Sequence, residues 1–393
     1  MTSSAKQIRA YTGPALFSYG FRPFFLFGAL WAALAVAVWL PMLNGLIAFP
    51  TVLQPVEWHV HELIYGYVPA VIAGFLLTAV PNWTGRLPVV GRPLAFLFAA
   101  WVAGRVAILT SSWIGAPAAA VIDLTFLAAL AAVIGREIVA SHNTRNLKVL
   151  VAVGILFAGN AAFHYQVMTG IGGGIGIRLG LAGIVTLIMV IGGRIIPSFT
   201  RNWLAQKRST TLPAPFERYD LVVMGISIAA LLLWVLLPTN PVTAVAAAIA
   251  GAANILRLSR WAGAHTTAEP LVLVLHVGFA FVPIGFLLLA LGIWRPDIVT
   301  PTGALHGWTA GAIGLMTLAV MTRASFGHTG QPMTATPPIQ LIYALAATAA
   351  LARIFAAFDF QREPMLYLSA TAWVLAFLGF VVVYAPLLAR RQT

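Results

Sequence analysis

The chain has 393 residues, of which 60% are hydrophobic and only 8% are charged, whereas soluble domains carry roughly 25% charged residues. This composition excludes a soluble enzyme or a nucleic-acid-binding module and predicts an all-α, polytopic membrane protein. Because the chain contains no cysteine, disulfides and thiolate metal sites are excluded. The net charge of +13 can be interpreted only after the basic residues have been assigned to the two sides of the membrane.

Twelve apolar stretches, each about 20 residues long, predict twelve transmembrane helices. They lie near residues 23–42, 56–80, 93–113, 117–135, 148–169, 177–197, 220–238, 242–257, 270–293, 303–322, 338–358 and 365–388. The longest predicted connection between helices separates the first six helices from the last six. We therefore expect an N-terminal half at residues 1–197, a central cytoplasmic linker at 198–219 and a C-terminal half at 220–393.

Basic residues are distributed unequally between the two sides of this predicted bundle. One side holds only Arg178, Arg295, Arg353 and Arg362, and nearly every other Lys and Arg lies on the opposite side. Basic loops remain in the cytoplasm, so both termini are expected there. The segment 1–20 lacks a signal-peptide pattern and is interpreted as a cytoplasmic tail. The positive charge therefore indicates lipid contact and not nucleic-acid binding.

Four histidines fall at one depth on three predicted helices. A rise of 1.5 Å per residue places His59 and His61 roughly 6–9 Å below the outer surface, His164 about 8 Å and His306 roughly 6 Å below it. Without cysteine, imidazoles are the side chains best able to hold iron, copper or zinc. Any one of these histidines taken alone suits a hydrogen-bonded core residue, but four at one depth predict a metal or haem site in the outer half of the bundle.

The spacing of His59 and His61 carries a further expectation. Residues two apart on a helix lie about 200° apart around its axis, so the two imidazoles are expected to serve different sites. Glu62 shares the face of His59 at a spacing of three, where it could orient an imidazole or carry a proton, and Tyr65 follows His61 by four residues. The alternative for Glu62 is a water-facing position near the interface.

On the cytoplasmic side, His276 is either a second cofactor ligand or a satisfied core residue. His328 follows the tenth predicted helix, within reach of Arg194 and Arg323. Guanidinium groups pair with carboxylates through two parallel hydrogen bonds, which suits the propionates of a haem.

Two charges lie deep in the third and fourth predicted helices. Arg105 and Asp123 are expected to form a structural ion pair, with a role in a proton path as the alternative. Asn160, one turn before His164, is expected either to fix the tautomer of that histidine or to join neighbouring helices.

Several short motifs together resemble the NnrS family. They are WHVHE at residues 58–62, YGY at 65–67, NAAFH at 160–164, GRIIPSFT at 193–200, LHVG at 275–278 and the stretch from His306 to Gly330. The resemblance extends over nearly the whole chain. It implies a bacterial inner-membrane protein that contains haem and copper and is linked to denitrification and to relief of nitric oxide stress.

The leading hypothesis is therefore a haem- and copper-containing membrane protein that binds and transforms nitric oxide and protects against nitrosative stress. Its expected ligands are His59, His61, His164 and His306, with Glu62 and Tyr65 as reactive groups, and with His276, His328, Arg194 and Arg323 at a second site. One alternative is a secondary transporter of a small solute or metal ion, with the histidines as binding or proton-relay groups. Another is a haem-binding scaffold or sensor. The sequence leaves open the electron donor and whether the protein is an oxidoreductase.

Overall fold

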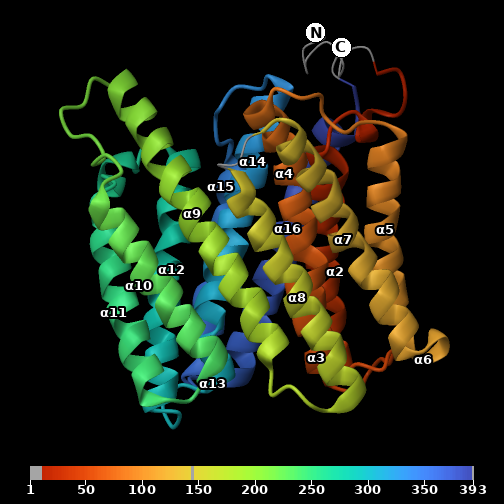
Figure 1. The fold of residues 1–393 in the computed structure, drawn as a ribbon. Helices are drawn as coiled ribbons and strands as arrows, with labels where there is room; N and C mark the ends of the chain where they lie inside the picture. The colour runs from red at the N-terminus through yellow and green to blue at the C-terminus, as the bar shows by residue number, and fades with distance from the viewer. Residues whose placement is uncertain (1–10, 143–145, 392–393) are drawn as a thin grey trace. The chain divides into compact units, whose positions relative to one another are not determined.

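All regular structure in the computed structural model, which describes residues 11–142 and 146–391, is helical (Figure 1). Twelve helices in these ranges are long and apolar enough to cross a membrane, which confirms the predicted fold class. The first ten residues of the predicted cytoplasmic tail lie outside the described residues.

The twelve spans follow one another with short connections. They are α2 (Phe21–Leu43), α3 to α4 (Pro55–Thr84), α5 (Arg92–Leu109), α7 (Ala116–Ala140), α8 (Leu147–Thr169), α9 (Ile175–Gln206), α10 (Arg218–Leu236), α11 (Pro241–Ser259), α12 (Pro270–Trp294), α13 to α14 (Pro301–Thr329), α15 (Pro337–Ala357) and α16 (Arg362–Ala389). Three short helices complete the fold, namely η1 (Ala15–Phe17), α6 (Ser111–Ile114) and η4 (Gly263–Thr266).

Two helices continue beyond their expected ends. α9 contains Pro197 in its interior and runs on to Gln206, so the non-helical part of the expected linker begins at Lys207. α14 runs to Thr329 and therefore includes His328, which was expected just beyond the helix. Prolines are tolerated inside membrane helices because neighbouring groups satisfy the freed backbone carbonyls. The division into six-helix halves remains a prediction.

Prolines and caps define where several spans begin. Pro55, Pro241 and Pro301 occupy the first turn of their helices, where a missing N–H costs nothing. At the start of α3 the Gln54 backbone N–H donates to Oε2 of Glu57 at 2.9 Å, which closes a capping box. These signals fix the start of the span that carries His59 and His61.

Two spans contain a π-helical segment directly after a histidine. η2 (Glu62–Tyr67) follows His61 in the second span, and η5 (Gly307–Ile313) follows His306 in the tenth. A π-helical turn holds one more residue than an α-helical turn, and it is frequent at functional sites. The extra residue rotates all later side chains around the helix axis.

The described residues form two compact units. The first unit contains the described residues up to Gly183, together with Ala324–Pro332 and the described residues from Phe377 onward. The second unit contains Ile184–Arg323 and Met333–Ala376.

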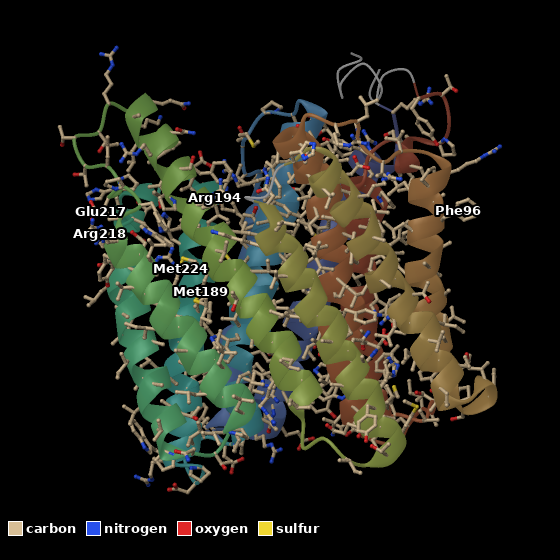
Figure 2. The ribbon with its side chains drawn as sticks, in the orientation of Figure 1. Phe96, Met189, Arg194, Glu217, Arg218 and Met224 are labelled. Atoms are coloured by element: carbon tan, nitrogen blue, oxygen red, sulfur yellow. The ribbon has the colours of Figure 1, made fainter. Side chains whose placement is uncertain are left out.

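In the first unit, α7 packs between α5 and α8, and α2 packs along α4 (Figure 1). Figure 2 shows Phe96 projecting outward from α5, where its side chain is 74% exposed. An apolar side chain of this exposure suits a surface that faces lipid. In the second unit, α11 packs against both α10 and α12.

Candidate metal centre

His61, the last residue of α3, lies at the centre of a polar cluster in the first unit. Its Nδ1 lies 2.9 Å from Oε1 of Glu62, the next residue in the chain. Its Nε2 lies 3.2 Å from Oδ2 of Asp123 on α7 and 3.2 Å from Oδ1 of Asn160 on α8. The His61 side chain has no exposed surface, so both of its ring nitrogens face oxygen atoms of the protein interior.

Asp123 joins α5, α7 and α8. Nε2 of His164 lies 3.0 Å from Oδ2 of Asp123, and Nδ2 of Asn160 donates to the same oxygen at 2.7 Å. Both of these residues lie on α8, where side chains four residues apart share one face. From α5, Nη2 of Arg105 donates to Oδ1 of Asp123. The predicted ion pair between Arg105 and Asp123 is confirmed.

Arg105 also binds a second carboxylate. Its Nη1 donates to Oε2 of Glu62 at 2.7 Å, and Nε1 of Trp31 on α2 donates to the same oxygen at 2.8 Å. The side chain of Glu62 is fully buried, so the water-facing alternative for this residue is wrong. Buried charges are tolerated when they are paired in this way, because an uncompensated charge is strongly destabilising.

Two glycines allow the Arg105 guanidinium to reach both acids. A Cβ atom at Gly66, in the π-helical segment, would collide with Nη1 of Arg105, and one at Gly104 would lie 2.9 Å from Oδ1 of Asp123. Nε1 of Trp101 donates to the backbone oxygen of Gly66 at 2.8 Å, which satisfies a carbonyl of the π-helical turn. The π-helical turn after His61 therefore leaves space for the Arg105 side chain, and its freed carbonyl is hydrogen-bonded.

The arrangement has the chemistry of a metal site. His61, Asp123 and His164 each offer one ligand atom, and these atoms lie within 4.8 Å of one another, with all three residues buried. Two imidazoles and a carboxylate suit iron, copper or zinc and leave a coordination position open. A metal-binding imidazole usually donates its second N–H to a carboxylate, and Glu62 occupies that position beside His61. The residues present therefore fit such an ion.

His59 and Tyr65 lie outside the three-ligand group. The His59 ring stacks on Trp39 with centroids 4.0 Å apart, as expected if the two histidines of the pair face different sides. The hydroxyl of Tyr65 donates to the backbone oxygen of Gly176 at 2.6 Å. The Tyr65 ring centroid lies 5.7 Å from that of His61, so this buried phenol lies beside the cluster.

His276 and Arg323 belong to the second unit. Nε2 of His276 lies 2.8 Å from Oγ1 of Thr200, and its buried Nδ1 has no hydrogen-bond partner among the described residues. A Cβ atom at Gly263 would lie 2.6 Å from that Nδ1. The guanidinium carbon of Arg323 lies 3.9 Å from the centre of the ring of Phe199, the neighbour of Thr200. The two predicted second-site residues thus contact adjacent residues of α9.

The other predicted residues take separate positions. Arg194 lies on α9, where Figure 2 labels it, and its side chain is exposed. Nδ1 of His306 lies 3.0 Å from the backbone oxygen of Thr302, in the second unit. His328 is exposed, lies in the first unit and packs edge-on against Tyr19 at a centroid distance of 5.3 Å. Of the four histidines expected in one layer, the described cluster brings together His61 and His164.

Sequence reasoning found most components of the cluster and one of its connections, the ion pair between Arg105 and Asp123. Asp123 was paired with Arg105 and not recognised as a ligand, and Trp31 was not singled out. Asn160 contacts His61 and Asp123, so of its two expected roles the structure supports the one that joins neighbouring helices. Depth was the available signal, because Arg105 and Asp123 lie about 12 and 10 Å below the outer surface by the same rise, close to the histidines.

The fold and the cluster define a class of protein, namely a polytopic membrane protein with a buried His/Asp/His group able to hold a metal ion. A family model described as NnrS protein matches residues 15–392. The chain therefore belongs to the NnrS family. A search of curated proteins gives no match.

Proposed function

We propose that this protein is a membrane metalloprotein that binds nitric oxide at a redox metal held by His61, Asp123 and His164. In this proposal it contains copper and haem, transforms nitric oxide and limits nitrosative stress in denitrifying bacteria. The metal assignment rests on the cluster, and the haem and nitric oxide assignments rest on the resemblance of the His-bearing motifs to the NnrS family.

One observation carries the metal assignment. Both ring nitrogens of His61 lie close to carboxylates, with Asp123 on the ligand side and Glu62 on the opposite side. This is the usual surrounding of an imidazole that binds a metal, in which a second carboxylate fixes the orientation of the ring. A bound copper or iron ion would supply a centre that binds nitric oxide and exchanges electrons.

The surrounding residues have distinct tasks in this proposal. The Glu62 carboxylate orients His61 by accepting a hydrogen bond from Nδ1 of its ring, while Tyr65 lies beside the ring as a proton-bearing group. Trp31 and Arg105 hold Oε2 of Glu62. Water is excluded because all of these groups except Trp31 are buried.

The haem would occupy a different place. His276 is the candidate ligand with the best support, because its buried Nδ1 has no hydrogen-bond partner among the described residues. Arg323, which contacts the neighbouring part of α9, would face a propionate. His59, His306, His328 and Arg194 remain alternative partners of the haem.

The proposed setting is the bacterial inner membrane, with both termini in the cytoplasm as the distribution of basic residues predicts. Nitric oxide is small and apolar, so it can arrive through the bilayer. Turnover would require an electron donor.

The direct test is to purify the full chain in detergent from cells supplied with haem and copper. We expect a Soret band, copper in the elemental analysis, and loss of nitric oxide when an electron donor is added. The H276A variant should lose the Soret band and keep its copper, and H164A should do the reverse. A colourless protein without copper or iron would contradict the proposal.

A further inference from the structure

The candidate metal centre is surrounded by three fixed, buried charges. Asp123 and Glu62 each contribute one negative charge, and Arg105, hydrogen-bonded to both, contributes one positive charge. Imidazoles bind metals in their neutral form, so His61 and His164 add no charge. The protein side of the centre therefore carries one net negative charge.

The charge of the bound metal then determines whether the centre is neutral. A monovalent ion would cancel the net charge, whereas a divalent ion would leave one positive charge in the protein interior. Residual charge is expensive in a buried site within a membrane. The side chains of Glu62 and Asp123 have almost no exposed surface, so water can compensate little of this residual charge.

We infer that Arg105 adapts this centre to a monovalent metal ion, and that this ion is copper(I). The inference rests on the proposed metal-binding function and adds to it the favoured oxidation state and the residue that sets it. Sodium and potassium prefer shells of oxygen ligands, whereas two of the three donors here are imidazole nitrogens. Copper is a redox metal that proteins bind in the monovalent state, and imidazole nitrogens are among the ligands that suit copper.

Arg105 is suited to this task because its charge is held in place. Its two terminal nitrogens donate to one oxygen of each acid. Gly66 and Gly104 provide the space for this bridge, since a Cβ atom at either position would press on the bridge atoms. Arg105 is thus a positioning residue that acts on the metal through Asp123 and through the total charge of the cluster.

The test compares wild-type protein with R105Q, E62Q and the double variant R105Q/E62Q, each as the purified full chain loaded with copper. Elemental analysis gives the copper content, and electron paramagnetic resonance at a fixed ambient potential gives the ratio of copper(II) to copper(I). Removing the positive charge should raise this ratio roughly tenfold or more, because charges a few ångströms apart interact strongly in a protein interior. E62Q should lower the ratio.

The double variant distinguishes charge from structure. It lacks the Arg105–Glu62 pair but keeps the net charge of the wild-type cluster, so its ratio should return toward the wild-type value, and R105K should stay close to it. If Arg105 has a purely structural role, the ratio of copper(II) to copper(I) in the double variant should differ from the wild-type ratio at least as much as it does in R105Q. If R105Q does not fold, E62Q is compared with R105Q/E62Q. These two proteins also differ only in the charge at position 105, so the ratio of copper(II) to copper(I) should again rise when that charge is removed.

Two results would overturn the inference. A copper-loaded R105Q protein with an unchanged ratio would remove the role of Arg105 and leave the proposed metal site intact. A wild-type protein that holds no copper at these ligands would overturn the metal site and the inference together.

Discussion

Two regions of the molecule differ in how their buried acids and imidazoles are paired, namely the cluster around Asp123 in the first unit and the surroundings of His276 in the second. Within that cluster, only Nε of Arg105 is buried without a hydrogen-bond partner among the described residues. In the first unit, all four carboxylate oxygens of Glu62 and Asp123 and both ring nitrogens of His61 have partners. In the second unit, Nδ1 of His276, Nε of Arg323 and Nη2 of Arg257 are buried without a hydrogen-bond partner in the described ranges.

This difference distinguishes a pre-formed ion site from a region in which buried nitrogen atoms have no hydrogen-bond partner within the described part of the chain. Buried polar atoms are nearly always hydrogen-bonded, so an unpartnered group indicates a ligand, an ordered water or a packing constraint. The cluster around Asp123 has enough oxygen atoms to compensate a cation. Near His276, Arg323 instead presents a guanidinium group whose buried Nε has no hydrogen-bond partner among the described residues, which suits an anionic group such as the proposed haem propionate.

The largest expected effect comes from removing the acid at the centre of the first region. Asp123→Ala would leave Nη2 of Arg105 and Nδ2 of Asn160 without their acceptor, and each buried donor left unsatisfied typically costs about 1–3 kcal/mol. Thermal unfolding of metal-free protein in detergent should show a large decrease in stability. Asp297→Ala is the control, because its ion pair with Arg295 is exposed, and little change is expected. Equal unfolding temperatures for wild type and the Asp123 variant would contradict the paired-charge description.

A smaller effect is expected in the second region at Gly193. A Cβ atom there would collide with Nη2 of Arg257, a fully buried side chain that also donates to Asp220 at 3.0 Å. Gly193→Ala should therefore destabilise the protein by about 1–3 kcal/mol, the usual cost of overpacking.

Gly225→Ala is the matched control for that substitution. Gly225 lies within α10, and nothing would lie within 4 Å of its Cβ. This change should be neutral or slightly stabilising, because alanine is the better helix former. If both alanine variants unfold at the same temperature, the close approach of Arg257 to α9 is not a constraint.

The smallest effect is expected at Trp31. Trp31→Phe removes one donor from Oε2 of Glu62 and leaves Arg105 on the same atom, so a loss of about 1 kcal/mol is expected, with the metal retained. Trp39→Phe, on the same helix, should cost less, because Nε1 of Trp39 has no hydrogen-bond partner among the described residues. A Trp31 variant that loses all of its metal would show that the second acid depends on Trp31 more than on Arg105.

The spans could be predicted from sequence because membrane helices require long apolar stretches, and hydropathy reports these directly. The ends of two helices could not be predicted from the sequence. Dividing the chain at Pro197 ended the sixth span too early, since α9 continues through this proline to Gln206. Likewise, the polar composition around His328 suggested a loop where α14 persists to Thr329.

The candidate site was only half accessible to sequence reasoning. Depth along a helix follows from residue number, and it placed His61, His164, Arg105 and Asp123 at similar levels. Rotation around the helix axis decides which of them meet, and the π-helical turn after His61 alters that rotation in a way that periodicity does not reveal. The direction of Glu62 toward His61 and Arg105 therefore had to come from the structure.

The most direct test of the account is the copper content of purified wild-type, H59A and H61A/H164A proteins, measured by elemental analysis. The account predicts similar copper in wild type and H59A, because the His59 ring stacks on Trp39 outside the three-ligand group, and loss of that copper in H61A/H164A. Full copper retention in a folded H61A/H164A protein would contradict the assignment of the metal to this cluster.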